Sequence, residues 1–130
     1  IPFNEVDGPQ NYISKMMRYD CLLKATNSLS QLDEFAAACI ACWTRRVPFG
    51  VYNLTNPGSV TTEDVVRLIK KHGLTQKAFR FFESEDQFMQ QAAKTPRSNC
   101  VLDTARAEAL GLPMTPVVDA LEIAMRRWNA

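Results

Sequence analysis

The sequence lacks the glycine clusters that phosphate-binding turns require. Its five glycines stand at positions 8, 50, 58, 73 and 111, which is too far apart for a GxGxxG turn or a P-loop. We therefore expect no nucleotide cofactor to be bound by this chain alone through those routes.

An excess of charge of one sign is also absent. Fifteen Lys and Arg residues face 14 Asp and Glu residues, so the net charge is only +1, and nucleic acid and anionic membrane surfaces are not favoured as partners. No apolar run approaches the roughly 20 residues of a membrane-spanning helix, and the N-terminus lacks the pattern of a signal peptide. We expect a soluble, cytoplasmic chain of one domain, residues 1–130, which is long enough to bury a core.

Histidine is nearly absent, which limits metal and acid–base chemistry. The single histidine, His72, follows two lysines at a predicted helix end, where a solvated cap is the favoured interpretation. Cys39 and Cys42 form a CxxC that is consistent with a redox pair or with half of a zinc site, but no second half exists. Together with Cys21 and Cys100 they form no disulfide framework, which is typical of a reducing compartment.

A buried helix face is the favoured interpretation of the CxxC segment. Apolar residues recur at i, i+3, i+4, i+7 and i+11, the spacing of a helix stripe that packs against a core. The residues of this stripe are Leu32, Phe35, Ala36, Cys39 and Trp43. We therefore expect this stripe to be buried.

Helical and strand patterns alternate along the chain. A strand and a turn are expected over residues 1–10, and further extended segments over 21–26, 49–56, 79–82 and 100–103. Helices are expected over 11–18, from Ser30 to 46, from a Thr61–Asp64 capping box to Gly73, from Ser84, from Asp103 to Gly111, and over 115–128. The pattern predicts an α/β fold, a small lobe of short strands and about five helices.

Three segments, taken in order, resemble one enzyme family. They are GPQNYISKM at 8–16, FGVYNLTNPGSVTTEDVVRLI at 49–69 and TPRSNCVLDTARAEALG at 95–111. They look like the C-terminal half of extended short-chain dehydrogenase/reductases of the NAD-dependent epimerase/dehydratase family, which act on nucleotide-sugars. The resemblance is strongest to the branch with dTDP-4-dehydrorhamnose reductases and nucleotide-rhamnose 3,5-epimerase/4-reductases.

The resemblance implies a substrate-binding part of a Rossmann-type enzyme whose cofactor domain is absent from this chain. In that family the first half holds NAD(P) and a Tyr-x-x-x-Lys pair. Here the residues four positions after Tyr12, Tyr19 and Tyr52 are Met, Leu and Asn. The chain is thus expected to be inactive alone, with residues 1–5 as a strand that joins the main sheet of the missing Rossmann half. A non-catalytic binding or regulatory module and a purely structural role are the alternatives.

The resemblance also implies a set of contacts with a dTDP- or UDP-linked sugar. A helix N-terminus and an ammonium group favour a diphosphate, and an Arg suits forked contacts with phosphate oxygens. The implied substrate-binding residues are Asn4, Asn11, Lys15, Arg97, Ser98 and Asn99. Each has a structural alternative, such as a helix cap for Asn11, a solvated helix face for Lys15, or a surface ion pair for Arg97.

Two departures from the family concern the sugar more than the fold. Gln10 stands where plant-type rhamnose enzymes tend to have Arg, and Arg106 stands where a Lys usually follows the strand end. The resemblance further implies that apolar surface is exposed where the missing half would dock, which predicts self-association.

Overall fold

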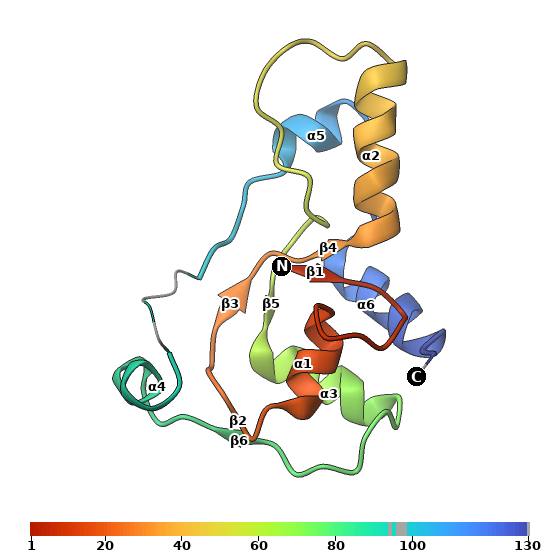
Figure 1. Ribbon diagram of the computed structural model, residues 1–130. Helices are drawn as coiled ribbons and strands as arrows, with labels where there is room; N and C mark the ends of the chain where they lie inside the picture. The colour runs from red at the N-terminus through yellow and green to blue at the C-terminus, as the bar shows by residue number, and fades with distance from the viewer. Residues whose placement is uncertain (94, 96–98, 130) are drawn as a thin grey trace.

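The computed structural model describes residues 1–93, 95 and 99–129, and over these residues the chain forms an α/β fold with six helices and short strands (Figure 1). The strands are β1 (Pro2–Phe3), β2 (Cys21–Leu22), β3 (Thr26–Asn27), β4 (Ser30–Gln31), β5 (Val60–Thr61) and β6 (Arg80–Phe81). The helices are α1 (Tyr12–Arg18), α2 (Leu32–Thr44), α3 (Thr62–Lys71), α4 (Glu85–Gln91), α5 (Ala105–Ala109) and α6 (Val117–Arg126).

The strands pair two by two. β1 runs parallel to β4 with Pro2 opposite Ser30, and β2 runs parallel to β6 with Cys21 opposite Arg80. β3 and β5 are antiparallel, with Thr26 opposite Thr61. These short pairs fasten the loops to the helices rather than forming one continuous sheet.

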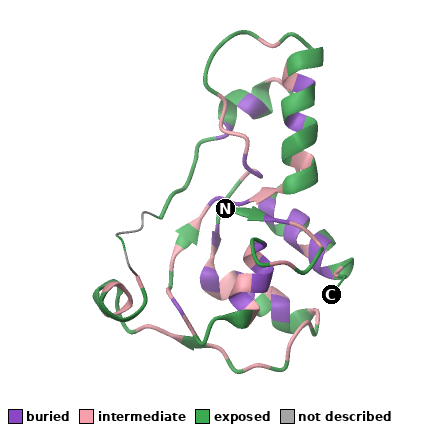
Figure 2. Ribbon diagram, in the orientation of Figure 1, coloured by how far each residue is buried: buried purple, intermediate pink, exposed green. Residues whose placement is uncertain are grey.

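Most of the molecule is a body, which we define as α1, α3, α6 and the strand pairs. The apolar sides of α3 and α6 face this body, because Val65 and Ile69 of α3 and Leu121 of α6 are fully buried. Phe3 of β1 and Ile13 of α1 belong to the same fully buried centre. Figure 2 shows the buried residues concentrated in this body.

An arm projects from the body in Figure 1. We define the arm as α2, the loop 45–54 that follows it, and residues 105–112, which contain α5. Its interior is small and consists of Ala41, Ala107 and Leu112, with Leu54 and Leu110 packed beside them. Arg106 joins α5 to the loop 45–54, since its guanidinium donates to the Val51 carbonyl at 3.0 Å.

The helix boundaries follow the local signals in the sequence. Asn11 and Ser84 cap α1 and α4 through their side chains, and the predicted Thr61–Asp64 capping box is present at the start of α3. Gly73 and Gly111 adopt positive φ angles of 64° and 63° just after α3 and α5, as the left-handed end of a helix requires.

Two predicted strands are wrong. Residues 49–56 and 100–103 contain no strand, and each segment is instead held by isolated hydrogen bonds. Ser28 donates its N–H to the Cys100 carbonyl at 2.9 Å, and the Asn53 amide donates to the Asp103 carbonyl at 2.8 Å. An alternating apolar pattern predicts a strand only where a neighbouring strand edge can pair with it, and these segments have no such neighbour among the described residues.

The predicted buried face of the long helix is also wrong. Leu32, Phe35 and Trp43 of α2 are 42%, 41% and 70% exposed, while Ala38 and Ala41 on the opposite side are buried. The helix therefore turns its small residues toward the chain and its large ones outward. None of the helices in the described part of the chain combines the length and apolarity needed to cross a membrane.

Candidate functional site

A groove of about 460 Å³ lies between α1 and the extended residues 21–27. The segment 95–111, the third of those that resemble the enzyme family, contributes the side chain of Asn99 to this groove. The residues that line it are Ile1, Tyr12, Met16, Tyr19, Cys21, Leu22, Leu23, Ala25, Asn27, Thr62, Phe88 and Asn99. The groove is thus mainly apolar and aromatic, with a few amide and hydroxyl groups, which is the usual composition of a small-molecule site.

Tyr12 forms part of the floor of this groove. Burial raises the pKa of Tyr12 to about 12, against the opposing effect of its hydrogen bond with Thr62. The Thr62 hydroxyl also donates to the Leu23 carbonyl at 2.8 Å and accepts from the Ala25 N–H at 3.2 Å. The first turn of α3 therefore holds Tyr12 and residues 23–25 in place beside the groove.

The polar end of the groove is built from two asparagines. The Asn27 amide donates to Asn99 Oδ1 at 3.4 Å, and Asn27 Oδ1 accepts from the Cys100 N–H at 2.9 Å. The hydrogen bond from Ser28 to the Cys100 carbonyl adds a second link. Asn99 is exposed, so the side chain remains accessible to a ligand.

Asn4 and Asn11 meet in the turn that leads into α1. The buried Asn11 amide donates to Asn4 Oδ1 at 2.8 Å and to the Val6 carbonyl at 2.7 Å, while Asn11 Oδ1 accepts from the Ile13 N–H at 3.0 Å. Asn4 Oδ1 also accepts from the Val6 N–H at 3.3 Å. These contacts show that both side chains shape the turn and cap the helix, and their contact with a substrate stays a prediction.

The structure brings only part of the predicted set together. Lys15 is half-buried on α1 but does not line the groove, whereas Asn99 does. Arg97 and Ser98 lie outside the described residues. Sequence reasoning missed Asn27 and Thr62, and the signal that marks them is spatial, because each meets the groove only after β3 pairs with β5.

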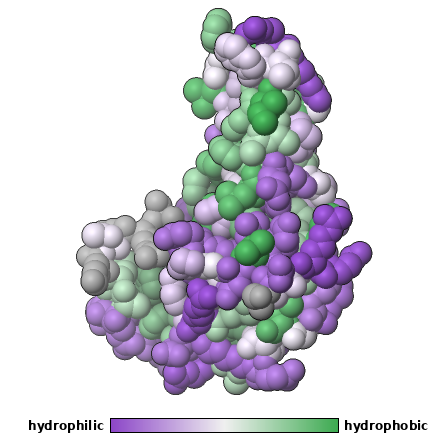
Figure 3. All heavy atoms as spheres, turned by 45° about the vertical axis from the view of Figure 1, so that its right-hand side comes forward, coloured by the Kyte–Doolittle hydropathy of each residue, from purple (hydrophilic) through white to green (hydrophobic). Residues whose placement is uncertain are grey.

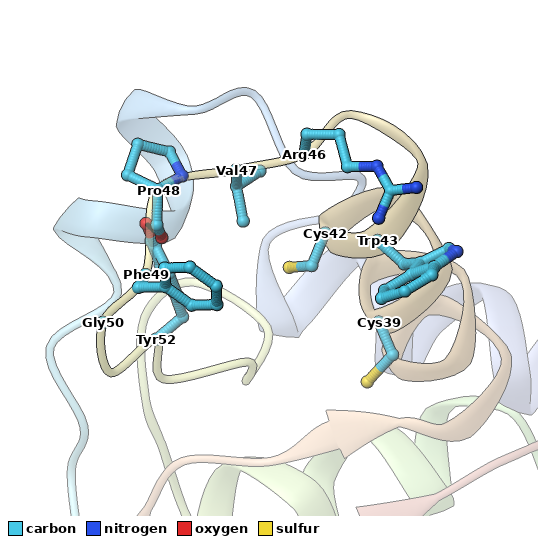
Figure 4. Close-up of a pocket in the computed structure, with 9 residues that line it drawn as sticks. All are labelled: Cys39, Cys42, Trp43, Arg46, Val47, Pro48, Phe49, Gly50 and Tyr52. Atoms are coloured by element: carbon cyan, nitrogen blue, oxygen red, sulfur yellow. Dashed lines mark hydrogen bonds between the residues drawn. The ribbon is translucent and has the colours of Figure 1, made fainter.

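A second cavity of about 500 Å³ lies on the arm, between the end of α2 and the following loop (Figure 4). Cys39, Cys42 and Trp43 form one side and Phe49 and Tyr52 the other. The two cysteines are free thiols. No cluster of three or more His, Cys, Asp or Glu side chains suited to a metal ion occurs within residues 1–93, 95 and 99–129.

Comparison with known proteins gives a consistent set of relatives. No family model matches the chain. It is 28% identical over 118 residues to a trifunctional UDP-glucose 4,6-dehydratase/UDP-4-keto-6-deoxy-D-glucose 3,5-epimerase/UDP-4-keto-L-rhamnose-reductase of Arabidopsis thaliana, which covers 91% of this chain and 17% of that protein. It is 29% identical over 103 residues to a bifunctional dTDP-4-dehydrorhamnose 3,5-epimerase/dTDP-4-dehydrorhamnose reductase of the same plant, over 79% of this chain and 33% of that protein.

A solved structure has the same fold. The UDP-rhamnose synthase L780 of Acanthamoeba polyphaga mimivirus superposes with a TM-score of 0.85 at 22% identity, over 97% of this chain and 43% of that chain. The chain thus spans less than half of each of these relatives. These matches show that the chain is homologous to the C-terminal part of the rhamnose-forming 3,5-epimerase/reductase proteins.

Proposed function

We propose that this chain is the substrate-binding portion of an NAD(P)-dependent nucleotide-sugar epimerase, dehydratase or reductase. The supporting observation is the groove that α1 and Asn99 share, because these two elements come from separate segments of the resemblance. The homologous proteins carry names that specify UDP- and dTDP-linked sugars, so a ligand of this class is the first to test.

The walls of the groove suit the two chemical parts of such a ligand. Tyr12, Tyr19 and Phe88 offer aromatic surface to a base or to the apolar face of a sugar ring. Asn27 and Asn99 offer amide groups to hydroxyls and carbonyls. Positive charge for the diphosphate would come from Arg97 and from Lys15, which lies on α1 outside the lining of the groove; both remain predictions.

We place the NAD(P) site of the proposed enzyme outside this chain. A dinucleotide site needs a strand, a glycine-rich turn and a helix in succession, whereas Gly73 and Gly111 of this chain each follow the end of a helix. The described residues therefore do not fit NAD(P), and we derive no hydride or proton transfer here. The contribution of this portion would be to orient the sugar and exclude water from it.

The cofactor-binding half is the proposed partner in the intact enzyme. β1 and β4 form a parallel pair of two residues each, and parallel strands occur almost exclusively within larger sheets that helices cover. Neighbouring strands from the cofactor-binding half would continue this pair. The sugar would then lie between the two halves.

Isothermal titration with UDP-glucose and dTDP-glucose tests the proposal. We expect saturable binding that Asn99→Ala and Lys15→Ala weaken. Arg126→Ala, which removes a charge from the exposed surface of α6, is the matched control and should leave binding unchanged. A folded chain that binds none of these ligands would contradict the proposal and favour a regulatory or structural module.

A further inference from the structure

The segment 72–79 between α3 and β6 carries a lysine that is turned toward the protein. The surface of the body in Figure 3 is mainly hydrophilic, and lysine side chains usually lie on such a surface, in water. The side chain of Lys77, however, is only 27% exposed. Its backbone is well anchored, since Leu74 and Phe79 on either side pack against the core of the body. The Lys77 N–H also donates to Thr75 Oγ1 at 3.2 Å.

The ammonium group of Lys77 binds backbone carbonyls at the end of α1. Its Nζ donates to the Tyr19 carbonyl at 2.5 Å and to the Met17 carbonyl at 3.4 Å. The last carbonyls of a helix have no partner within the helix, and a positive charge is favourable beside them. Asp20 Oδ1 lies 3.9 Å from Nζ, but the Asp20 side chain is 93% exposed, so water screens this ion pair. The two carbonyls are therefore the main partners of the ammonium group.

The turn that Lys77 contacts forms part of the wall of the candidate groove. Tyr19 and Cys21 both line the groove, and both also line a second cavity of about 550 Å³ that includes Phe82 and residues of α4. Side chains that border two cavities are packed less tightly than core residues, so their position depends on how their backbone is held. The chain leaves α1 at Tyr19 and enters β2 at Cys21, and the pairing of β2 with β6 is only two residues long. Lys77 thus holds the end of this turn that the strand pair does not reach.

We propose that Lys77 is a positioning residue of the candidate groove. Its ammonium group joins the turn between α1 and β2 to the segment that leads into β6, and so keeps Tyr19 and Cys21 where a ligand meets them. Lys77 is not one of the residues that line the groove, so it acts through the turn rather than by direct contact. Because it assigns Lys77 a part in nucleotide-sugar binding, this inference rests on the proposed function.

Titration with UDP-glucose compares three variants with the wild-type chain. Lys77→Met removes the charge but keeps an unbranched side chain, and it should raise the dissociation constant by about tenfold, the factor expected for the loss of a hydrogen bond to a charged group. Lys77→Arg keeps a charged donor and should restore most of the affinity. Lys70→Met is the charge-matched control, because Lys70 is exposed on the last turn of α3, and it should leave the dissociation constant unchanged.

A general loss of stability would not produce this pattern. The apparent dissociation constant rises only as the folded fraction falls, so a tenfold change would need about nine-tenths of the chain to be unfolded, which circular dichroism would detect. A folded Lys77→Met chain that binds UDP-glucose as tightly as the wild type would rule out the role of Lys77 and leave the proposed function intact. A wild-type chain that binds no UDP-glucose would instead contradict the proposed function.

Amide hydrogen exchange tests the hold on the turn without any ligand. In Lys77→Met the amides of residues 19–22 should exchange faster than in the wild type by about tenfold, because local opening of the turn becomes easier. The amides of α6, which carries the fully buried Leu121, should keep their protection, and Lys77→Arg should recover slow exchange at residues 19–22. Unchanged exchange at these residues in Lys77→Met would show that Lys77 does not position the turn, whether or not the wild-type chain binds UDP-glucose.

Discussion

The body and the arm of this chain are stabilised in different ways. In the body, large side chains such as Phe3, Ile69 and Leu121 are fully buried, and hydrophobic burial holds α3 against α6. In the arm, the interior contains little more than Ala41, Ala107 and Leu112. The large apolar residues of the arm lie outside rather than inside.

Polar contacts replace hydrophobic burial where the arm joins the body. Asn56 is fully buried, and its Oδ1 accepts from the Gln31 N–H at 2.7 Å. Its amide donates to Glu34 Oε2 and to the Thr115 carbonyl, both at 2.7 Å. The start of α2 is thereby fixed to the segment that precedes α6. From this contrast we expect the body to unfold independently of the arm, and the arm to depend on this junction.

The largest effect is expected from a truncation in the body. Leu121→Ala should lower the free energy of unfolding by about 3–4 kcal/mol, since Leu121 is fully buried and leaves a cavity in a close-packed core. Leu112→Ala in the arm should cost less, because its surroundings are small and can collapse. Urea unfolding of dilute protein measures both.

The two tryptophans separate these responses. Trp128 packs against the core of the body and Trp43 lies on the arm, so a Trp43→Phe background reports on the body and a Trp128→Phe background on the arm. If each substitution lowered the free energy of unfolding equally in the two backgrounds, the two regions would unfold as one unit.

A smaller loss is expected at the junction. Asn56→Ala removes three hydrogen bonds made by the buried side chain, and should cost about 2–3 kcal/mol, since buried groups are left unsatisfied. Asn53→Ala is the control, because its exposed amide makes a single bond to the Asp103 carbonyl. The loss at Asn56 should appear first in the fluorescence of Trp43, and simultaneous unfolding at Trp128 would contradict an independent body.

The body was also the region that the sequence predicted best. Caps at Asn11 and Thr61 and the end of α3 at Gly73 are local signals, and local hydrogen bonds in the structure confirm them. The face of α2 was assigned wrongly because periodicity identifies an apolar stripe without saying which partner covers it. When the partner lies outside the chain, the same stripe is exposed.

The candidate groove could be predicted only in part for a similar reason. The resemblance identified the segments of α1 and Asn99, which do meet. Asn27 and Thr62 reach the groove through the β3–β5 pairing, and two-residue strands leave almost no periodic signal in a sequence. The role of Asn11 as a cap was foreseen as an alternative, and its hydrogen bonds confirm the cap.

The floor of the groove gives the body a specific sensitivity to alkali. The pKa of Tyr12 is raised to about 12, so the folded chain keeps the phenol proton at a pH where the unfolded chain, near its ordinary value of about 10, has lost it. The stability that this provides is present below pH 10 and declines between pH 10 and 12. Two pKa units correspond to about 2–3 kcal/mol.

Urea unfolding at pH 9 and at pH 11.5 measures this effect. The wild-type chain should lose more stability between the two values than Tyr12→Phe, which has no phenol to titrate. Tyr12 lies in the body, so the loss should be seen by Trp128. Identical losses in the two proteins would contradict the desolvation of the Tyr12 phenol by its burial.

The smallest effects are expected at the ends of three helices, where body and arm can be compared residue for residue. Gly73, Gly111 and Arg46 all adopt positive φ after α3, α5 and α2, and in each case the next residue donates back into the last turn. A Cβ at Gly73 or Gly111 would meet nothing within 4 Å, so an alanine there should cost only the conformational penalty of about 1 kcal/mol.

In the arm, Arg46 is a residue with a side chain that already adopts a positive φ, of 51°, and so carries the conformational penalty. Arg46→Gly should relieve it, but it also removes the guanidinium that stacks 4.3 Å from the Trp43 ring, a contact of about 0.5–1 kcal/mol at an exposed site. The two terms nearly cancel, so we expect a change below about 0.5 kcal/mol. Arg46→Lys keeps a positive charge and the left-handed backbone but not the planar stack, and should be less stable than either protein. Thermal unfolding of the set measures these differences, and a clear gain in Arg46→Gly would mean that the stack on Trp43 contributes little to holding the end of α2.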